Sequence, residues 1–123
     1  MILVDTSVWV DHLRRAEEML TDLLDREQVL THPFVIGELA LGHLRQRDAV
    51  LEALQDLHQA MVARDEEVLR AIEHERLFGL GLGYVDVHLL ASVRLTPDAS
   101  LWTRDRRLLA AAERLSLAAR VTH

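Results

Sequence analysis

The sequence predicts an α/β domain with a central, mostly parallel sheet that is flanked by helices on both faces. Short apolar runs alternate along the chain with longer segments of helical spacing, which is typical of that class. The first run, Met1 to Val4, is continuously apolar, as in a parallel strand covered on both sides. With 123 residues, half of them apolar, the chain suits one domain with a core of its own. We therefore expect a single domain over residues 1–123.

The first half of the chain divides into alternating strands and helices. The predicted segments are a strand at residues 1–5, a helix begun by Thr6 or Ser7, a helix at 17–26, a strand at 29–30 and a helix at 33–44. Hydroxyl side chains are good helix caps. Leucines recur on one face of residues 17–26, and Pro33 suits the first turn of a helix.

The second half continues the alternation around a glycine-rich segment. We expect helices at residues 48–58, 65–78, 84–95 and 105–115, and strands at 61–63, 101–102 and 120–122. Asp48 and Asp65 can cap the first two of these helices. Gly79, Gly81 and Gly83 interrupt the helical pattern. Their G-x-G-x-G spacing follows a helix and differs from the dinucleotide fingerprint, so they predict a bend.

Charge and composition exclude several classes of function. The net charge is −6, which argues against a broad electrostatic grip on nucleic acid, so a phosphate-bearing partner must meet local arginines or metal ions. The chain has no lysine, which excludes a Walker P-loop and a lysine Schiff base. It has no cysteine, which fits a reducing cytoplasm and excludes a thiolate site. Because neither a signal peptide nor a membrane span is evident, we expect a cytoplasmic protein without a membrane partner.

Four acidic residues stand out by their position in the predicted elements. Asp5 closes the first strand, and Asp105 follows Thr103 just beyond the fourth. Functional groups in open α/β sheets gather beyond the carboxyl ends of the strands, so these two would share a crevice if their strands are neighbours. Glu38 and Asp86 lie within otherwise apolar helices, where a carboxylate is costly unless it is paired or binds a metal.

A cluster of these four carboxylates would require cations, because the negative charges repel one another. Mg²⁺ takes oxygen ligands and keeps several waters, so a carboxylate cluster without histidine or cysteine suits Mg²⁺ or Mn²⁺. One or two such ions can hold a phosphodiester, activate a water and stabilise the leaving oxygen. The four residues therefore indicate metal-assisted phosphodiester chemistry.

Each of the four also has a simpler explanation. Asp5 and Asp105 could be helix N-caps, and Asp86 could complement the dipole at a helix N-terminus. Glu38 could lie on a solvated face of its helix. Each residue alone is weak evidence, so the prediction depends on all four together.

The same residues carry a resemblance to PIN-domain proteins. Four segments resemble the four acidic motifs of that family in the family's order: Met1-Ile-Leu-Val-Asp5-Thr-Ser-Val-Trp9, Val35-Ile-Gly-Glu38-Leu, Gly83-Tyr-Val-Asp86-Val-His-Leu-Leu-Ala-Ser92 and Leu101-Trp-Thr-Arg-Asp105-Arg-Arg-Leu. The matches run from residue 1 to about residue 108. Within the family, the short chain and its Asp-Thr-Ser-Val-Trp opening resemble the VapC group of toxins.

The resemblance implies a function and a set of site residues. The implied catalytic and metal-binding residues are Asp5, Glu38, Asp86 and Asp105. They would form a pocket for Mg²⁺ or Mn²⁺ in which metal-activated water attacks an RNA phosphodiester. Thr6 or Ser7, and Thr103, would support the pocket by hydrogen bonds. The resemblance also implies a VapB-like antitoxin as partner and a homodimer. Asp105 stands at the family's most variable acidic position.

Three arginines flank the fourth carboxylate: Arg104, Arg106 and Arg107. They could contact RNA phosphates, since the guanidinium forms bidentate bonds with phosphate. They could equally form the solvated face of a helix. His88 lies two residues after Asp86 on a different helix face, so we expect no shared set of metal ligands there.

Two other functions compete with the ribonuclease. A receiver-like phosphotransfer or phosphatase domain usually places a lysine beside its acidic pocket, and this chain has none. A catalytically inactive PIN-like partner-binding module would keep the fold, but a buried carboxylate cluster destabilises a fold unless its charge is compensated. We therefore predict a metal-dependent endoribonuclease, the toxin of a VapBC-type toxin–antitoxin pair, with the inactive module as the alternative.

Overall fold

A computed structural model describes residues 1–121 and contains one four-stranded sheet. The strands are β1 (Ile2–Val4), β2 (Val29–Thr31), β3 (His58–Gln59) and β4 (Ser100–Trp102), in the spatial order β3-β2-β1-β4. Every pairing among them is parallel. Leu3 of β1 pairs with Leu30 on one side and with Leu101 on the other. The predicted α/β class with a parallel sheet is confirmed.

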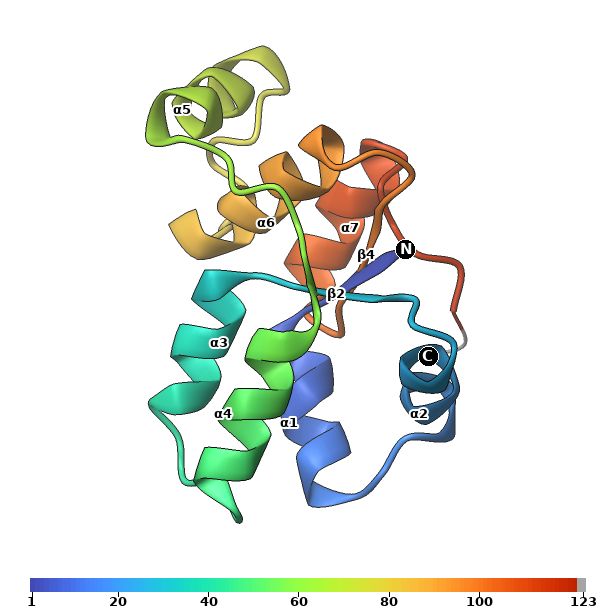
Figure 1. Ribbon diagram of the computed structural model, residues 1–123. Helices are drawn as coiled ribbons and strands as arrows, with labels where there is room; N and C mark the ends of the chain where they lie inside the picture. Colours follow the sequence, from blue (N-terminus) through green and yellow to red (C-terminus); the bar gives the residue numbers. More distant parts are fainter. Residues whose placement is uncertain (122–123) are drawn as a thin grey trace.

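Helices connect the strands and cover the sheet on both sides. They are α1 (Thr6–Arg14), α2 (Glu18–Asp25), α3 (Pro33–Ala40), α4 (Arg47–Asp56), α5 (Asp65–His74), α6 (Tyr84–Leu95) and α7 (Arg106–Arg114). Helices α1, α3 and α4 lie on one side of the sheet, and α6 and α7 lie on the other (Figure 1). Helix α5 lies beyond α6 at the edge of the molecule. None of the helices in residues 1–121 is long and apolar enough to cross a membrane.

The strand order brings the ends of β1 and β4 together. The chain moves outward from β1 through β2 to β3 and then returns across the sheet to β4. With right-handed connections, this reversal puts the later helices on the opposite face. Side chains that follow β1 and β4 therefore meet where the connections diverge, which is the usual place for a site in an open parallel sheet.

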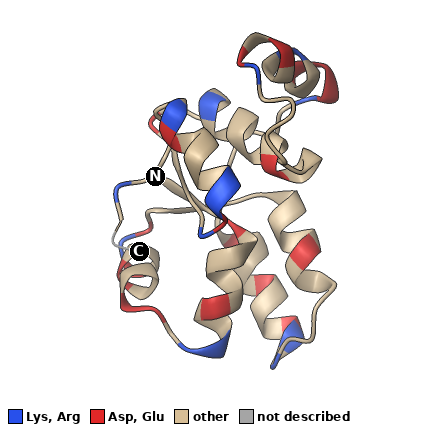
Figure 2. Ribbon diagram, turned by 180° about the vertical axis from the view of Figure 1, so that it is seen from behind, with Lys and Arg blue, Asp and Glu red and all other residues tan. Residues whose placement is uncertain are grey.

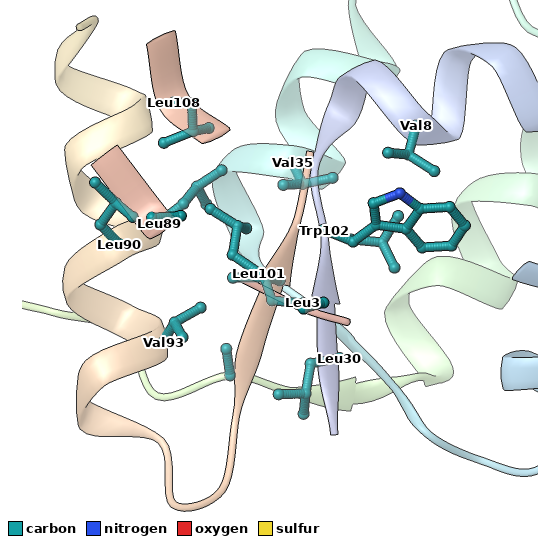
Figure 3. Packing of buried hydrophobic residues seen from close by; sticks show 14 of the residues in the cluster. Leu3, Val8, Leu30, Val35, Leu89, Leu90, Val93, Leu101, Trp102 and Leu108 are labelled. Atoms are coloured by element: carbon teal, nitrogen blue, oxygen red, sulfur yellow. The ribbon is translucent and has the colours of Figure 1, made fainter. Parts of the chain in front are cut away.

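The core fixes these two strand ends in place. Trp102 of β4 lies beside Val8 of α1, whereas Leu89 and Val93 of α6 lie on the other side of the sheet (Figure 3). All four side chains are buried. Burying a side chain of this size contributes about 1.5–3 kcal/mol, so packing on both faces holds the residues after β1 and β4 firmly.

The third strand lies earlier in the chain than the sequence predicted. The apolar run at residues 61–63 forms no strand; instead His58 and Gln59 pair with β2. Both residues are exposed, because β3 is an edge strand. No apolar run therefore marks this strand in the sequence. The N–H of Ala63 donates to the hydroxyl of Ser92 on α6.

Helix boundaries differ from the predictions at several caps. Asp5 caps α1 in place of Thr6 or Ser7, since its carboxylate accepts the N–H of Ser7. Gln46 and Arg64, and not Asp48 and Asp65, occupy the cap positions of α4 and α5. The helices predicted to reach residues 44 and 78 end at residues 40 and 74.

The predicted edge strand at residues 120–122 is wrong for residues 120 and 121, which have no strand conformation. Residue 122 lies outside the described residues. Ala118 instead makes a single bridge to Leu101, whose N–H and C=O bond to Leu117 and Ala119. The chain thus completes its contact with β4 a few residues earlier than expected.

Candidate active site

Asp5 lies at the end of β1 in a dense set of hydrogen bonds. Its side chain is buried, and its Oδ2 atom accepts three donors. These are the hydroxyl of Ser7 at 2.6 Å, the hydroxyl of Thr103 at 2.8 Å and the N–H of Ser7 at 3.3 Å. Hydrogen bonds to an ionised group are stronger than neutral ones, so this carboxylate has a fixed orientation.

The two hydroxyls also join β1–α1 to the β4–α7 turn. Ser7 Oγ accepts the N–H of Arg104 at 3.0 Å, and Thr103 Oγ1 accepts the N–H of Asp105 at 3.1 Å. Each hydroxyl therefore accepts from a backbone amide and donates to Asp5. This arrangement links residues that are about 100 positions apart in the chain and holds both ends at one edge of the sheet.

Asp105 has the cap position that the sequence left open as an alternative. It is the N-cap of α7, and its Oδ1 atom accepts the N–H of Leu108 at 2.9 Å. The residue is exposed. Capping uses one carboxylate oxygen only, so the cap and a role in a site are compatible.

Glu38 lies on the exposed side of α3, next to the start of α1. Its Oε1 atom accepts the hydroxyl of Thr6 at 2.7 Å. Thr6 and Ser7, which the sequence offered as alternatives, thus contact different carboxylates: Thr6 contacts Glu38, and Ser7 contacts Asp5.

Asp86 is half-buried in the first turn of α6, and its pKa is raised above the ordinary value of 3.8. Burial is the main cause, and the negative charges of Asp5, Asp105 and Glu38 act in the same direction. A hydrogen bond from the Gly83 N–H to Oδ2, at 3.3 Å, opposes them by stabilising the ionised form. Asp5, Glu38 and Asp105 are therefore close enough to Asp86 for their charges to act on it.

The four carboxylates share a pattern of hydrogen bonding. Each has one oxygen that accepts a nearby N–H or hydroxyl, and a second oxygen without a hydrogen-bond partner among residues 1–121. No three Asp, Glu or His side chains in that range lie close enough together to enclose an ion. The charges converge, but the arrangement is open, and a cation would have to complete its coordination with water.

The arginines near Asp105 are arranged differently from one another. Arg104 forms ion pairs with Asp11 at 2.6 Å and Glu17 at 3.0 Å. Arg107 lies against the glycine-rich segment, where its guanidinium is 3.5 Å from the carbonyl of Gly81. Arg106 is exposed and has no ion pair within the described residues. Seen from behind, arginine and acidic segments are interspersed (Figure 2).

Sequence reasoning missed a cluster beside Asp86. The hydroxyl of Tyr84 and the Nε2 atom of His88 both contact Oδ1 of Asp65, at 2.8 and 3.0 Å. Tyr84 and His88 are four residues apart, so they share one face of α6, and that spacing was the available signal. Their partner lies 19 residues before Tyr84, a pairing that periodicity within one helix does not reveal.

A groove opens beside Glu38 between α1, α3 and α4. Its lining includes Val10, Leu13, Glu38, Leu39, Gly42 and Val50. Val10 and Leu13 are exposed there although both are apolar. The groove thus offers an apolar surface that ends at one of the acidic side chains.

Comparison with known proteins agrees with this architecture. A family profile described as "PIN domain" matches residues 2–114. The chain is similar to Ribonuclease VapC32 from two strains of Mycobacterium tuberculosis, with 55% identity over 111 residues. The aligned region covers 90% of this chain and 90% of each relative.

Proposed function

The chain belongs to the PIN-domain family and is a VapC-type ribonuclease toxin, and on that premise we propose that its four clustered carboxylates bind the divalent cation of the active site. The four are Asp5, Glu38, Asp86 and Asp105. Nucleases of this type are typically metal-dependent, and the type implies a cognate VapB antitoxin. The finer assignment is an endoribonuclease that uses Mg²⁺ or Mn²⁺ to hydrolyse RNA phosphodiester bonds, in a PIN domain that extends over residues 1–123.

One observation supports this assignment most strongly: among residues 1–121, each carboxylate has one oxygen that accepts a hydrogen bond and one oxygen without a partner. Asp86 would gain most from a bound cation, because burial and, to a smaller extent, three carboxylates raise its pKa. An oxygen-only donor set without histidine or cysteine fits Mg²⁺ or Mn²⁺. Mg²⁺ keeps several waters, so an open arrangement of carboxylates is compatible with it.

The residues of the chain have separate tasks in this proposal. A bound divalent cation would act as a Lewis acid that polarises the phosphodiester and activates a water. Ser7 and Thr103 hold Asp5 in one orientation, and Thr6 holds Glu38. The second oxygen of each of these two carboxylates is thereby oriented before the substrate binds. This lowers the entropic cost of ordering the site during the reaction.

RNA must approach a protein whose net charge is −6. We propose that Arg106 and Arg107, at the start of α7, contact its phosphates. Arg104 is engaged with Asp11 and Glu17, so we assign it to holding the β4–α7 turn.

The test is RNA cleavage by the purified protein, freed of any partner, against total cellular RNA. Wild type is compared with Asp5→Asn and Asp86→Asn, each with Mg²⁺, with Mn²⁺ and with chelator. The matched control is Asp22→Asn, which removes an exposed carboxylate of α2 that forms an ion pair with Arg26 of the same helix region. We expect discrete metal-dependent cuts in wild type and the control, and a loss of at least about 100-fold in both site variants.

The same experiment can reject the proposal. A protein that binds no Mn²⁺ and cuts no RNA would be the inactive partner-binding module. Cleavage that survives both site substitutions would place the chemistry elsewhere in the chain.

We propose that the antitoxin binds in the groove beside Glu38, because exposed Val10 and Leu13 lie there. Both proteins would act in the cytoplasm, where RNA is present. Leu13→Asp is expected to abolish binding of the antitoxin while the free protein still cuts RNA. Undiminished binding by this variant would contradict the assignment of the groove.

We also propose a homodimer. Large apolar side chains are exposed on α5 and around the ends of α6: Leu69, Phe78, Leu80 and Leu95. Sedimentation equilibrium is expected to give twice the 14.0 kDa of one chain. A single-chain mass at every concentration would contradict the dimer.

A further inference from the structure

The first turn of α6 carries Asp86 but has little support from its own surroundings. It begins directly after a segment in which Gly79 and Gly81 have left-handed backbone conformations, with φ of +73° and +76°. Residues 87–93 are all buried, so packing fixes the helix from residue 87 onward. Residues 84–86 are half-buried or exposed. The turn that carries the carboxylate therefore needs another means of support.

Electrostatic repulsion acts on this turn. Burial is the largest cause that raises the pKa of Asp86, and the 3.3 Å hydrogen bond from Gly83 opposes it. The negative charges of Asp5, Asp105 and Glu38 then add a smaller repulsion. Repulsion between like charges favours movement of Asp86 away from the other three. Outward movement of Asp86 would open the first turn of the helix.

Asp65 holds the same turn from its other side. Its Oδ1 atom accepts the hydroxyl of Tyr84 at 2.8 Å and the Nε2–H of His88 at 3.0 Å. His88 is only 2% exposed, and its ring meets Tyr84 edge to face at a centroid distance of 4.9 Å. The two hydrogen bonds to the Asp65 carboxylate thus come from the residues two positions before and two positions after Asp86.

The geometry of a helix makes these two bonds effective. Positions 84 and 88 lie on one face, whereas position 86 is about 200° around the axis from position 84. The bonds to Asp65 therefore hold the face opposite to the carboxylate that is repelled. Phe34 of α3 also meets the His88 ring, at 4.7 Å, and so connects this contact to the helix that carries Glu38.

We propose that Asp65, Tyr84 and His88 form a clamp that keeps Asp86 within the acidic site. In this role Tyr84 and His88 are positioning residues, since they act through Asp86. The clamp ties the start of α5 to the start of α6 and limits how far the first turn can open. The inference rests on the proposed function only in assigning Asp86 to the cation.

The test compares two links between α5 and α6. Asp65→Ala removes the clamp, Tyr84→Phe removes one of its bonds, and His88→Gln keeps a side-chain N–H that can reach Asp65. The matched control is Arg94→Gln, which breaks the ion pair with Glu75 that also joins α5 to α6, near the far end of α6.

Two readouts are measured for each variant. The first is amide hydrogen exchange of Val87, whose N–H bonds to the Gly83 carbonyl at 3.2 Å, in protein without cations. The second is the affinity for Mn²⁺ alone, measured by electron paramagnetic resonance. Exchange reports opening of the turn directly and does not depend on the catalytic proposal.

In Asp65→Ala we expect exchange of Val87 to rise by about tenfold and Mn²⁺ affinity to fall by about tenfold, at the low end of losses seen when support behind a ligand is removed. Tyr84→Phe should show smaller changes of both kinds. His88→Gln loses the ring contacts with Phe34 and Tyr84 and should fall between wild type and Asp65→Ala, whereas Arg94→Gln should change neither quantity.

Unchanged exchange in Asp65→Ala would overturn the clamp, as would an equal rise in Arg94→Gln. Faster exchange with unaltered Mn²⁺ affinity would overturn its role in positioning Asp86. If wild type bound no Mn²⁺ at all, the proposed function would fail, whereas the exchange rates would still decide whether the clamp holds the turn.

Discussion

Asp5 and Asp86 lie in the same acidic site but are held in different ways. The Oδ2 atom of Asp5 accepts three donors from two separate elements, at distances from 2.6 to 3.3 Å. Asp86 accepts one backbone N–H from the residue that precedes its helix. On the sheet side of the site, at the end of β1, the protein's own donors therefore hold Asp5 in place. On the helix side, at the start of α6, a single donor offsets the charge of Asp86 among the described residues.

This difference indicates where a cation would change the molecule most. Donors from Ser7 and Thr103 compensate the charge of Asp5, whereas within the part of the chain that the structure describes Asp86 accepts the Gly83 N–H alone. Burial, together with the negative charges of the other three carboxylates, raises the pKa of Asp86. We expect substitutions on the sheet side to lower the free energy of unfolding. Neutralisation of Asp86 is expected to raise it.

Acid should produce the largest loss of stability on the strand side. His32 follows β2; its Nδ1 atom accepts the Phe34 N–H at 3.0 Å, and its Nε2 atom contacts Ser92 Oγ at 3.0 Å. Burial, aided by the charge of His88, lowers the pKa of His32 from 6.5 to about 4. Its contribution is full above pH 6.5 and is lost as pH falls toward 4. The loss should be about 2–3 kcal/mol in urea unfolding.

His32→Asn isolates this effect, because asparagine can cap α3 but does not titrate. The variant should lack the part of the pH dependence between 6.5 and 4. An identical pH profile in both proteins would show that His32 is not the group responsible.

Removal of one hydroxyl near Asp5 should give the next largest effect. Thr103→Val deletes a donor to Asp5 and an acceptor for the Asp105 N–H at a fully buried position. We expect a loss of about 2 kcal/mol in urea unfolding, since Asp5 then loses one of its three donors and the Asp105 N–H loses its acceptor. Thr21→Val, at an exposed helix position, is the control and should change stability by less than about 0.5 kcal/mol. Equal effects would contradict a special role for Thr103.

Arg104→Gln tests the outer support of the same turn. Its guanidinium bridges Asp11 and Glu17 and is 26% exposed, so solvent screens it only in part. We expect a loss of about 1 kcal/mol and a smaller loss of RNA cleavage than in Asp5→Asn. The double variant Arg104→Gln/Glu17→Gln completes the comparison. If Glu17→Gln alone lowered the free energy of unfolding as much as the double variant, Arg104 and Glu17 would act as one pair. Additive losses would contradict their coupling.

Asp86→Asn should give the smallest change, with the opposite sign. The folded pKa of Asp86 is raised, so ionisation destabilises the folded protein as pH rises from about 3.8 through the folded value. Without cations, the variant should be more stable than wild type at neutral pH by roughly 0.5 kcal/mol, a modest figure because the residue is half-exposed. Asp5→Asn should be less stable than wild type. A loss of stability in both variants would contradict the comparison.

Much of the fold could be predicted from the sequence because its signals are local. The helix at residues 84–95 and the strand at Leu101 and Trp102 follow from apolar spacing, and the structure agrees with both. The edge strand at His58 and Gln59 could not be predicted in this way, because its stability comes from pairing with β2 and its side chains are exposed. The apolar run at residues 61–63 is not a buried strand, since Ala63 lies in the core whereas Met61 and Val62 are exposed.

The candidate site was predictable as a set of residues but not as a geometry. The sequence identified Asp5, Glu38, Asp86 and Asp105, and the effect of the other three charges on Asp86 is a property of the fold. The engagement of Arg104 with α1 and the α1–α2 loop depends on contacts 93 residues apart in the chain, which no local pattern encodes. The assignment of the four residues to a cation stays a proposal.

The most direct test is the melting temperature of the purified protein as Mn²⁺ is added. Wild type is compared with Asp86→Asn and with the surface control Asp22→Asn. We expect Mn²⁺ to raise the melting temperature of wild type and the control, since a ligand that binds only the folded state stabilises it, and to have little effect on Asp86→Asn. No rise in wild type, or an equal rise in all three proteins, would contradict a cation site at Asp86.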